Sequence, residues 1–317
     1  MTDRVGDLLR CELPIQLAPM GSVSATAALP LAVARAGGHG MYPGLALPPE
    51  PLAGVLDALA AGTSAFGVNF IVPLMERASL DLAAARAPYV DFFLADPDPA
   101  LVELVHAGGG ACGWQVESAD EARAAEAAGC DVVVAKAWES GGRKRIEGPT
   151  LLALLDGVLD AVALPVIAAG GIATQRGVAA ALAAGADGVR VGTRFIAAEE
   201  SDAHPAWVQA VIAAAPGDAV VSDAFNVGQP QPGPHRVLRS SIEAAERLTD
   251  DEAGVVRLLG AEIPVPRFGA QPPTRESTGT IAAMPFYAGQ SAGAVATVQP
   301  AAEIVAELAR GLPAARR

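Results

Sequence analysis

The chain has 317 residues, of which 51% are hydrophobic and 4% aromatic, and its formal net charge is −13 at pH 7. This length allows one barrel with a sizeable insertion or two ordinary domains, and the negative charge argues against a nucleic-acid partner because it repels phosphate backbones. No stretch reaches the roughly 18 apolar residues of a membrane span, the N-terminus has no signal-peptide core, and three widely spaced cysteines indicate neither a disulfide framework nor a zinc site. We therefore expect a cytoplasmic protein that acts on a small molecule without a metal ion.

Eight short apolar runs predict eight β-strands, and helical patterns separate most of them. The expected strands are residues 13–18, 39–42, 65–70, 89–94, 111–116, 131–136, 165–169 and 188–191. The expected helices between them include residues 27–36, 52–60, 99–107, 118–128 and 174–184. Alternating strands and helices imply a parallel sheet, and eight repeats imply closure, so we predict an α/β fold of the (β/α)8 TIM-barrel class.

The alternation ends at residue 198. Helical patterns then cover residues 206–215, 240–248 and 251–259, whereas residues 226–234 and 265–280 are rich in turn-forming residues. We predict a barrel in residues 1–197 and a small insertion after strand eight, residues 198–290, that lies over the C-terminal mouth of the barrel. Residues 291–317 should return to the barrel through a last helix at residues 301–309.

Two expected strands end in glycine turns, Gly170-Gly171 after the seventh and Gly192-Thr193 after the eighth. A glycine turn after a parallel strand lets backbone N–H groups approach an anion closely, because no Cβ blocks the way. The loops after strands seven and eight of such barrels commonly form a phosphate site. The alternative is that both are ordinary strand-to-helix connections, but their repetition at one spacing favours the phosphate site.

Six segments carry a resemblance that extends over nearly the whole chain: QLAPMG, ARAGGHG, FGVNF, VVVAKAWESGG, PVIAAGGIATQRGVAAALAAGADGVRVGTRF and FYAGQSAG. In this order they resemble the nitronate monooxygenase family, formerly called 2-nitropropane dioxygenases, and the flavin-type enoyl-acyl-carrier-protein reductases share the pattern. The resemblance implies an FMN-dependent oxidoreductase that oxidises a nitronate or a similar small anion with oxygen as acceptor. It implies an FMN phosphate on the two glycine turns, and flavin-ring contacts from Ala18, Pro19, Met20, Asn69, Lys136, Gly289 and Gln290.

Three positions depart from the family pattern, and we take them as the candidate catalytic residues. Arg143 stands where the family motif Gly-x-Glu-Ala-Gly-Gly-His has its proton-handling histidine; an arginine cannot act as a base, but it can hold a nitronate or carboxylate by bidentate contacts. Lys136 replaces a frequent glutamine and adds a second cation near the flavin. His39 replaces a leucine, and it is either the remaining acid–base group or a structural histidine that donates to a backbone carbonyl.

Arg143, Lys144 and Arg145 form the one dense basic cluster of the sequence. Such a run is ordinarily a solvated loop, but here it could also hold the phosphates of a nicotinamide, a coenzyme A or a carrier-protein arm. Trp138 is either a contact of the flavin or substrate or a hydrophobic plug. His235 lies in a turn-rich loop, where we expect exposure to solvent rather than a place in the mouth of the barrel.

Two further functions are compatible with the same residues. One is an NAD(P)H-dependent FMN enoyl reductase or dehydrogenase that acts on acyl thioesters, with a thioester or a carrier protein as partner. The other is a flavin-binding protein that has lost catalysis together with the histidine. A homodimer is compatible with each of these functions.

Overall fold

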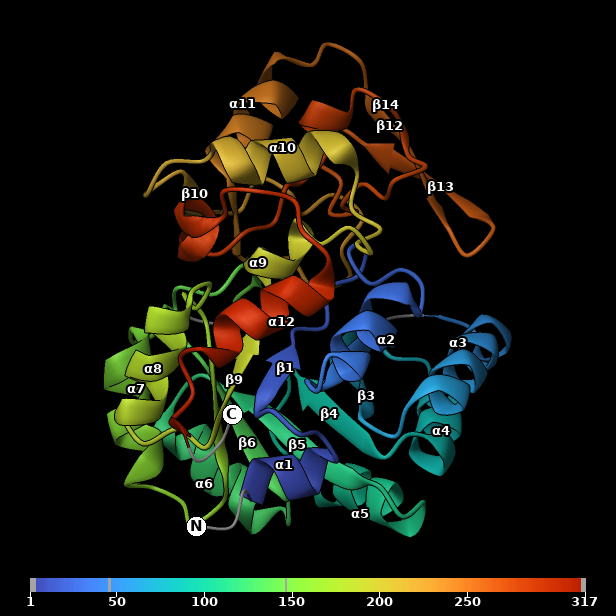
Figure 1. Ribbon diagram of the computed structural model, residues 1–317. Coiled ribbons are helices and arrows are strands. Elements are labelled where there is room, and N and C mark those ends of the chain that lie inside the picture. Colours follow the sequence, from blue (N-terminus) through green and yellow to red (C-terminus); the bar gives the residue numbers. More distant parts are fainter. Residues whose placement is uncertain (1–3, 45–46, 146, 315–317) are drawn as a thin grey trace.

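A computed structural model describes residues 4–44, 47–145 and 147–314. Eight parallel strands form its central sheet in the order β1-β9-β8-β6-β5-β4-β3-β2, and a parallel bridge between Gln16 and His39 brings the two edge strands together. The sheet is thereby curved into a barrel with helices around it (Figure 1). The strands are β1 (Ile15–Leu17), β2 (Gly40–Pro43), β3 (Phe66–Ile71), β4 (Tyr89–Phe93), β5 (Ala111–Val116), β6 (Val132–Lys136), β8 (Val166–Ala169) and β9 (Gly188–Val191).

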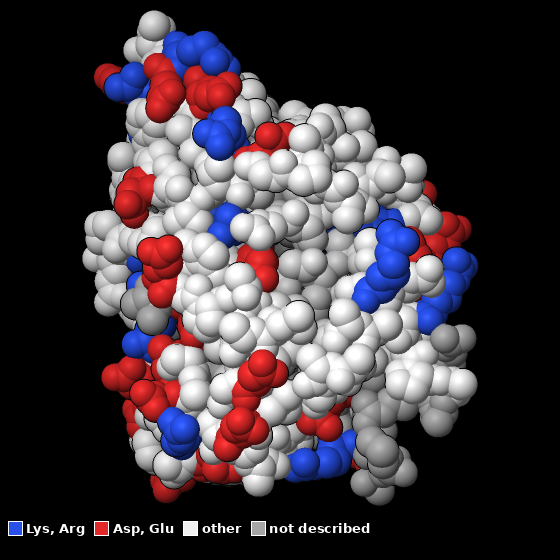
Figure 2. Space-filling view, turned by 90° about the vertical axis from the view of Figure 1, so that its left-hand side faces the viewer, with Lys and Arg blue, Asp and Glu red and all other residues white. Residues whose placement is uncertain are grey.

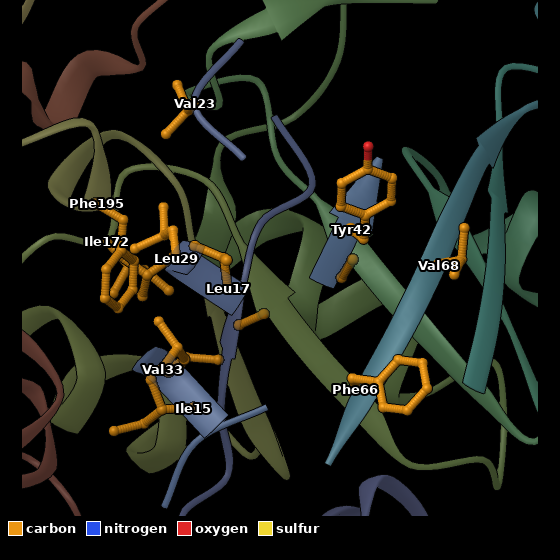
Figure 3. Packing of buried hydrophobic residues seen from close by; sticks show 14 of the residues in the cluster. Ile15, Leu17, Val23, Leu29, Val33, Tyr42, Phe66, Val68, Ile172 and Phe195 are labelled. Atoms are coloured by element: carbon orange, nitrogen blue, oxygen red, sulfur yellow. The ribbon is translucent and has the colours of Figure 1, made fainter. Parts of the chain in front are cut away.

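The TIM-barrel prediction is confirmed, and each of the eight strands lies where an apolar run predicts it. These strands are buried on both faces, as their continuous apolar composition requires. Figure 3 shows part of the resulting core, in which Ile15 and Leu17 of β1 pack with Leu29 and Val33 of the following helix. Aliphatic side chains therefore fill the space between strands and helices, which holds the ends of the strands in fixed positions.

Some of the surrounding helices begin at a residue whose side chain accepts a hydrogen bond from a free N–H group of the first turn. Ser118 accepts a hydrogen bond from the N–H of Glu121 at 3.1 Å, and Thr174 accepts one from the N–H of Gly177 at 3.2 Å. The helices around the barrel are α1 (Arg4–Leu9), α2 (Ala28–Arg35), α3 (Pro49–Gly62), α4 (Arg77–Arg86), α5 (Pro99–Ala107), α6 (Ala119–Ala127), α7 (Leu151–Leu159), α8 (Gln175–Ala183), α9 (Thr193–Ile196) and α12 (Ala301–Ala309). A short helix, η1 (Val72–Leu74), follows β3.

The segment between α9 and α12 lies beyond the C-terminal ends of the barrel strands (Figure 1). Its elements are α10 (Pro205–Ala213), β10 (Ala219–Ser222), β11 (His235–Leu238), α11 (Arg239–Arg247), β12 (Glu252–Leu258), β13 (Ala261–Pro266), β14 (Thr278–Gly279), η2 (Ile281–Ala283) and η3 (Gln290–Ala294). A two-residue strand from the barrel, β7 (Gly142–Arg143), pairs with β11 and joins the β10-β11 sheet. This pairing ties the segment to the loop after β6; its boundaries as a separate lid, residues 198–290, stay a prediction.

One predicted helix in this segment, residues 251–259, is wrong, because these residues form strand β12. Pairing with β13 and β14 on its two sides satisfies the backbone of β12 and overrides a composition that is compatible with either structure. Leu259 and Gly260 form the tight turn to β13, with φ values of 49° and 84°. The hairpin therefore depends on a partner strand that periodicity alone does not reveal.

Among the described residues, no helix combines the length and the apolar character that crossing a membrane requires. On the face seen in Figure 2, acidic and basic side chains are interspersed, so the described residues present no continuous basic surface there.

Candidate functional site

A cavity of about 670 Å³ lies between the C-terminal ends of the barrel strands and the segment above them. Its walls come from the loops after β1, β6, β8 and β9 and from residues around β11 and η3. The structure brings eleven of the predicted site residues to this cavity: Ala18, Pro19, Met20, Asn69, Lys136, Arg143, Gly170, Gly171, Gly192, Thr193 and Gly289. These residues, far apart in the sequence, thus share one site, whereas His39 and Gln290 do not line it.

The two glycine turns lie side by side, because β8 and β9 are neighbours with Ala169 opposite Arg190. Gly170 and Gly171 have φ values of 108° and 72°, which L side chains rarely adopt. A Cβ at Gly170 would lie 3.1 Å from the backbone nitrogen of Ser140. Within the described part of the chain, the N–H groups of Gly170 and Gly171 donate no hydrogen bond to the protein, so these backbone donors are available to a ligand.

Close backbone packing joins the loop after β6 to the segment before η3. The N–H of Gly289 donates to Thr193 Oγ1 at 2.9 Å, and a Cβ at Gly289 would lie 2.8 Å from the carbonyl oxygen of Glu139. The backbone N–H of Gln290 donates to that same carbonyl at 2.9 Å. The side chain of Gln290 is exposed and does not line the cavity, whereas its backbone positions the cavity wall; its contact with a flavin ring stays a prediction.

A buried ion pair forms the polar floor of the cavity. The guanidinium of Arg190 pairs with Asp91 and donates through Nε to Gln16 Oε1 at 2.6 Å. Asn69 Nδ2 donates to Asp91 Oδ1 at 2.7 Å, while burial raises the pKa of Asp91 against the opposing effect of Arg190. Nη1 of Arg190 is buried without a partner among the described residues, so the floor has an unused donor.

Lys136, at the end of β6, is held by three neighbours. Its Nζ lies 2.8 Å from Glu117 Oε1, 2.7 Å from the carbonyl oxygen of Arg143 and 4.3 Å from the centre of the Phe93 ring. Glu117 also accepts the N–H of Arg145 at 3.1 Å. Lys136 therefore lines the cavity as a charge whose partner, Glu117, also supports the loop that carries Arg143.

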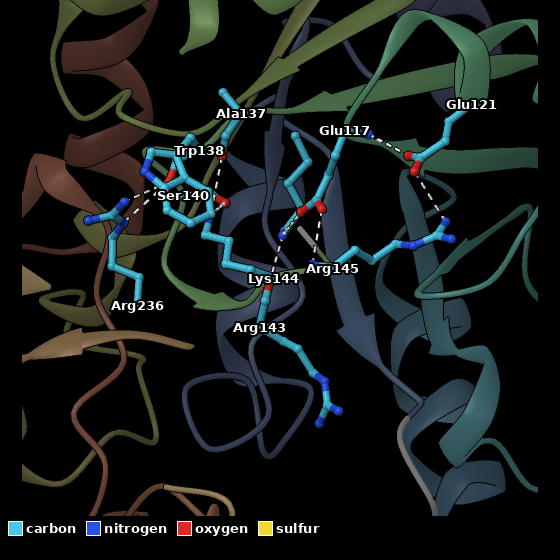
Figure 4. A network of polar contacts seen from close by, with 10 residues as sticks. Glu117, Glu121, Ala137, Trp138, Ser140, Arg143, Lys144, Arg145 and Arg236 are labelled. Carbon is cyan, nitrogen blue, oxygen red and sulfur yellow. Dashed lines mark hydrogen bonds and ion pairs between the residues drawn. The ribbon is translucent and has the colours of Figure 1, made fainter. Parts of the chain in front are cut away.

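The basic cluster does not act as a unit, because its three side chains point in different directions (Figure 4). Arg143 lines the cavity and donates from Nη1 to Gln229 Oε1 at 3.0 Å. Arg145 turns away to Asp96 at 2.9 Å and to Glu121 at 3.3 Å. The prediction that the three side chains hold ligand phosphates together is therefore wrong, because Arg143 is the only one of the three that lines the cavity.

Lys144 is the third member, and its side chain is buried at 2% exposure. Its Nζ donates to the carbonyl of Ala137 at 3.2 Å and to the Ser140 hydroxyl. It lies 5.6 Å from the centre of the Trp138 ring, which also contacts Arg236 at 5.5 Å. Burial, reinforced by Lys136, lowers the pKa of Lys144 to about 6. Lys144 and Trp138 thus stabilise the loop from within, and Trp138 does not line the cavity.

The position of His39 contradicts the prediction that it is an acid–base residue of the site. It precedes β2, so it lies at the opposite end of the strand from the cavity, and its side chain is 0% exposed. Its Nδ1 is 3.0 Å from Gln16 Nε2, and its ring contacts Tyr89 edge-on at 5.5 Å. Burial, followed by the charge of Arg190, lowers its pKa to about 3. His39 is therefore a core histidine whose ring nitrogen contacts the Gln16 amide, and it does not line the cavity.

His235 is the functional candidate that the sequence analysis missed. It begins β11 directly opposite Arg143 of β7 and lines the cavity at 4% exposure, not in solvent as predicted. Its ring stacks on Tyr287 at 5.3 Å. The run HRVL, rich in β-branched and aliphatic residues after a proline, was the available signal for a buried strand.

Comparison with known proteins gives consistent matches over this fold and site. The sequence model described as nitronate monooxygenase matches residues 67–311. A (3aS,4S,5R,7aS)-5-hydroxy-7a-methyl-1-oxo-octahydro-1H-indene-4-carboxyl-CoA dehydrogenase of Mycobacterium tuberculosis is 34% identical over 74% of this chain, and the match spans 66% of that relative's length.

Two solved structures are similar along almost their whole length. FabK from Thermotoga maritima has 30% identity and a TM-score of 0.78, with 97% of this chain and 95% of that one covered. Nitroalkane oxidase from Streptomyces ansochromogenes has 28% identity and a TM-score of 0.78, with 97% and 98% covered.

Proposed function

Because the chain belongs to the nitronate monooxygenase family, a family of oxidoreductases, we propose that it is an FMN-dependent enzyme that oxidises a nitronate or a similar small anion with oxygen as acceptor. One observation carries the proposal: two glycine turns with free backbone donors lie beside a cavity that contains Arg143, Lys136 and Arg190. The net charge of −13 repels an anionic ligand. Backbone N–H donors and cationic side chains at the cavity are therefore needed to bind it.

The residues present fit an FMN. The turns at Gly170-Gly171 and Gly192-Thr193 would hold its phosphate, since their backbone leaves room that a Cβ would fill. Ala18, Pro19 and Met20 would lie against the ring, and the unpartnered Nη1 of Arg190 is a donor for a ring carbonyl. The bound flavin would supply electron transfer between substrate and oxygen, while this chain binds, orients and encloses the reactants.

Arg143 is the residue that we assign to the substrate anion. Its Nη1 is engaged by a neutral amide, Gln229, and its Nε is buried without a partner among the described residues. Burial lowers its pKa below the ordinary value, but an arginine keeps its charge at any working pH. Arg143 can therefore hold a nitronate or carboxylate by charge-assisted hydrogen bonds.

A second function is favoured by a specific finding, the 34% identity to a dehydrogenase that is named for a coenzyme A thioester, together with the likeness to FabK. In this alternative NAD(P)H is the electron donor and an acyl thioester is the substrate. Apolar lining from Ile71, Phe93 and Tyr287 would suit an acyl chain.

Anaerobic mixing of the purified yellow protein separates these functions. We expect ethyl nitronate to bleach the flavin absorbance and oxygen to restore it, with oxygen consumed in turnover. Bleaching by NADPH and not by nitronate would support the thioester function. A flavin that neither compound reduces would indicate binding without catalysis, and protein that takes up no FMN would overturn the proposal.

A further inference from the structure

The cavity offers few groups that can accept a proton. Among the described residues that line it there is no Asp, Glu or Cys, and the titratable side chains are Lys136, Arg143, Arg190, His235 and Tyr287. The arginines stay protonated. Nζ of Lys136 is already engaged by Glu117 and by the carbonyl oxygen of Arg143. Burial raises the pKa of Tyr287, whose hydroxyl donates to the carbonyl of Ala270 at 2.9 Å. This leaves the imidazole of His235 as the cavity's base.

Geometry places this imidazole beside a fixed cation. His235 and Arg143 are directly opposite each other in the antiparallel β7-β11 pair, and side chains in this relation lie on the same face of a sheet as close neighbours. The stack on Tyr287 fixes the plane of the His235 ring. Its Nδ1 is buried without a partner among the described residues, so no carboxylate of the described chain occupies that nitrogen.

We infer that His235 removes a proton from the α-carbon of a neutral substrate with an acidic C–H bond, a nitroalkane, and that Arg143 binds the anion formed. The inference rests on the proposed function. In this step the Cα–H bond breaks, the proton bonds to an imidazole nitrogen of His235, and the electron pair of the C–H bond moves into the nitro group. The products are a nitronate and an imidazolium, which then releases its proton to solvent. The enzyme thereby generates its anionic substrate from the neutral acid.

The charges around His235 keep its imidazole neutral and ready to accept a proton. Burial, then the cation of Arg143, lowers its pKa to about 4; Lys136 acts in the same direction, and the carbonyl of Gly233 opposes them. Protonation should therefore reduce proton abstraction only near pH 4, well below the ordinary histidine range. The new nitronate next to the imidazolium stabilises both charges, which offsets the low basicity of the free residue.

The test compares nitroethane with pre-formed ethyl nitronate in His235→Asn, which keeps a polar side chain but no base. We expect kcat/KM for nitroethane to fall by a factor of roughly 100 or more, the usual contribution of a general base, and that for ethyl nitronate to stay within about threefold. A second readout needs no oxidation: anaerobic exchange of the nitroethane α-hydrogens in D₂O, followed by NMR, should slow by the same factor. His204→Asn is the matched control, because His204 lies outside the cavity and caps α10 through Nδ1, a role that asparagine can fill.

Each outcome decides the inference. Equal losses with nitroethane and ethyl nitronate, unchanged exchange in His235→Asn, or wild-type protein that oxidises ethyl nitronate but neither oxidises nitroethane nor exchanges its α-hydrogens would overturn the role of His235. Wild-type protein that exchanges the α-hydrogens but oxidises neither substrate would support His235 and overturn the proposed oxidation. Flavin absorbance and melting temperature like those of the wild type show that a variant is folded and loaded.

Discussion

Gly170→Ala is the substitution that tests the proposed phosphate site most directly. At a φ of 108°, any L side chain is strained, and the left-handed region costs roughly 1–2 kcal/mol. The new Cβ would also lie 3.1 Å from the nitrogen of Ser140 and 3.2 Å from the carbonyl oxygen of Ala137, both backbone atoms. The turn must shift to relieve these contacts. Loss of one N–H bond to a charged phosphate, about 1.5–3 kcal/mol, corresponds to an FMN affinity roughly 10 to 150 times weaker.

Gly109→Ala separates strain from ligand binding. Gly109 has a φ of 83°, and no heavy atom lies within 4 Å of its ideal Cβ, while its loop before β5 is remote from the cavity. Both variants should lose stability in thermal unfolding, by about 1–2 kcal/mol from the backbone alone. In titrations of the apoprotein followed by flavin fluorescence, only Gly170→Ala should bind FMN more weakly. Equal FMN affinity in the two variants would refute the reasoning.

Three other substitutions test the remaining features of the site. Arg143→Ala should raise KM for ethyl nitronate about tenfold or more, near 1.4 kcal/mol, and an unchanged KM in steady-state assays would remove its role in anion binding. Asp91→Asn leaves Arg190 as a buried charge without its partner and should lower the free energy of unfolding by about 3–5 kcal/mol. Asp81→Asn, in an exposed pair, should change the free energy of unfolding by less than roughly 1 kcal/mol. Equal effects of the two substitutions in chemical denaturation would contradict a contribution from the buried pair. Because the pKa of Lys144 in the folded protein is lowered to about 6, the unfolded chain binds this proton more tightly. The free energy of unfolding should therefore rise between pH 6 and 10, by up to roughly 1.4 kcal/mol per pH unit, and be lowest below pH 6. Lys144→Met should flatten this slope in urea unfolding at several pH values, and an unchanged slope would show that Lys144 is not its source.

The barrel was predictable because its signals are local. Each strand is a short apolar run that ends at a glycine, a proline or a polar residue, and each run is buried whichever neighbour it receives. The turns at Gly170-Gly171 and Gly192-Thr193 were also predictable, because glycine at a strand end indicates a tight turn that a residue with a Cβ would hinder. Residues 251–259 show the limit, since their strand exists through its pairing with β13.

The two histidines show the same limit at the level of function. His39 stands at the edge of a predicted strand, but it precedes that strand and therefore faces away from the cavity. His235 stands in a stretch that is rich in turn residues, and only its pairing with β7 turns it toward the cavity beside Arg143. The run HRVL indicates a buried strand at His235, but no local pattern shows which of the two histidines faces the cavity.

The sequence by itself determined the barrel, the glycine turns and the family to which this protein belongs, because periodicity and glycine geometry act over a few residues. Only the tertiary structure decided which cations and which histidine share the cavity. Adjacent residues such as Arg143, Lys144 and Arg145 have the same chemistry in the sequence, but strand pairing sends one to the cavity, one into the protein and one to surface carboxylates. That choice depends on contacts between distant parts of the chain, which no local signal encodes.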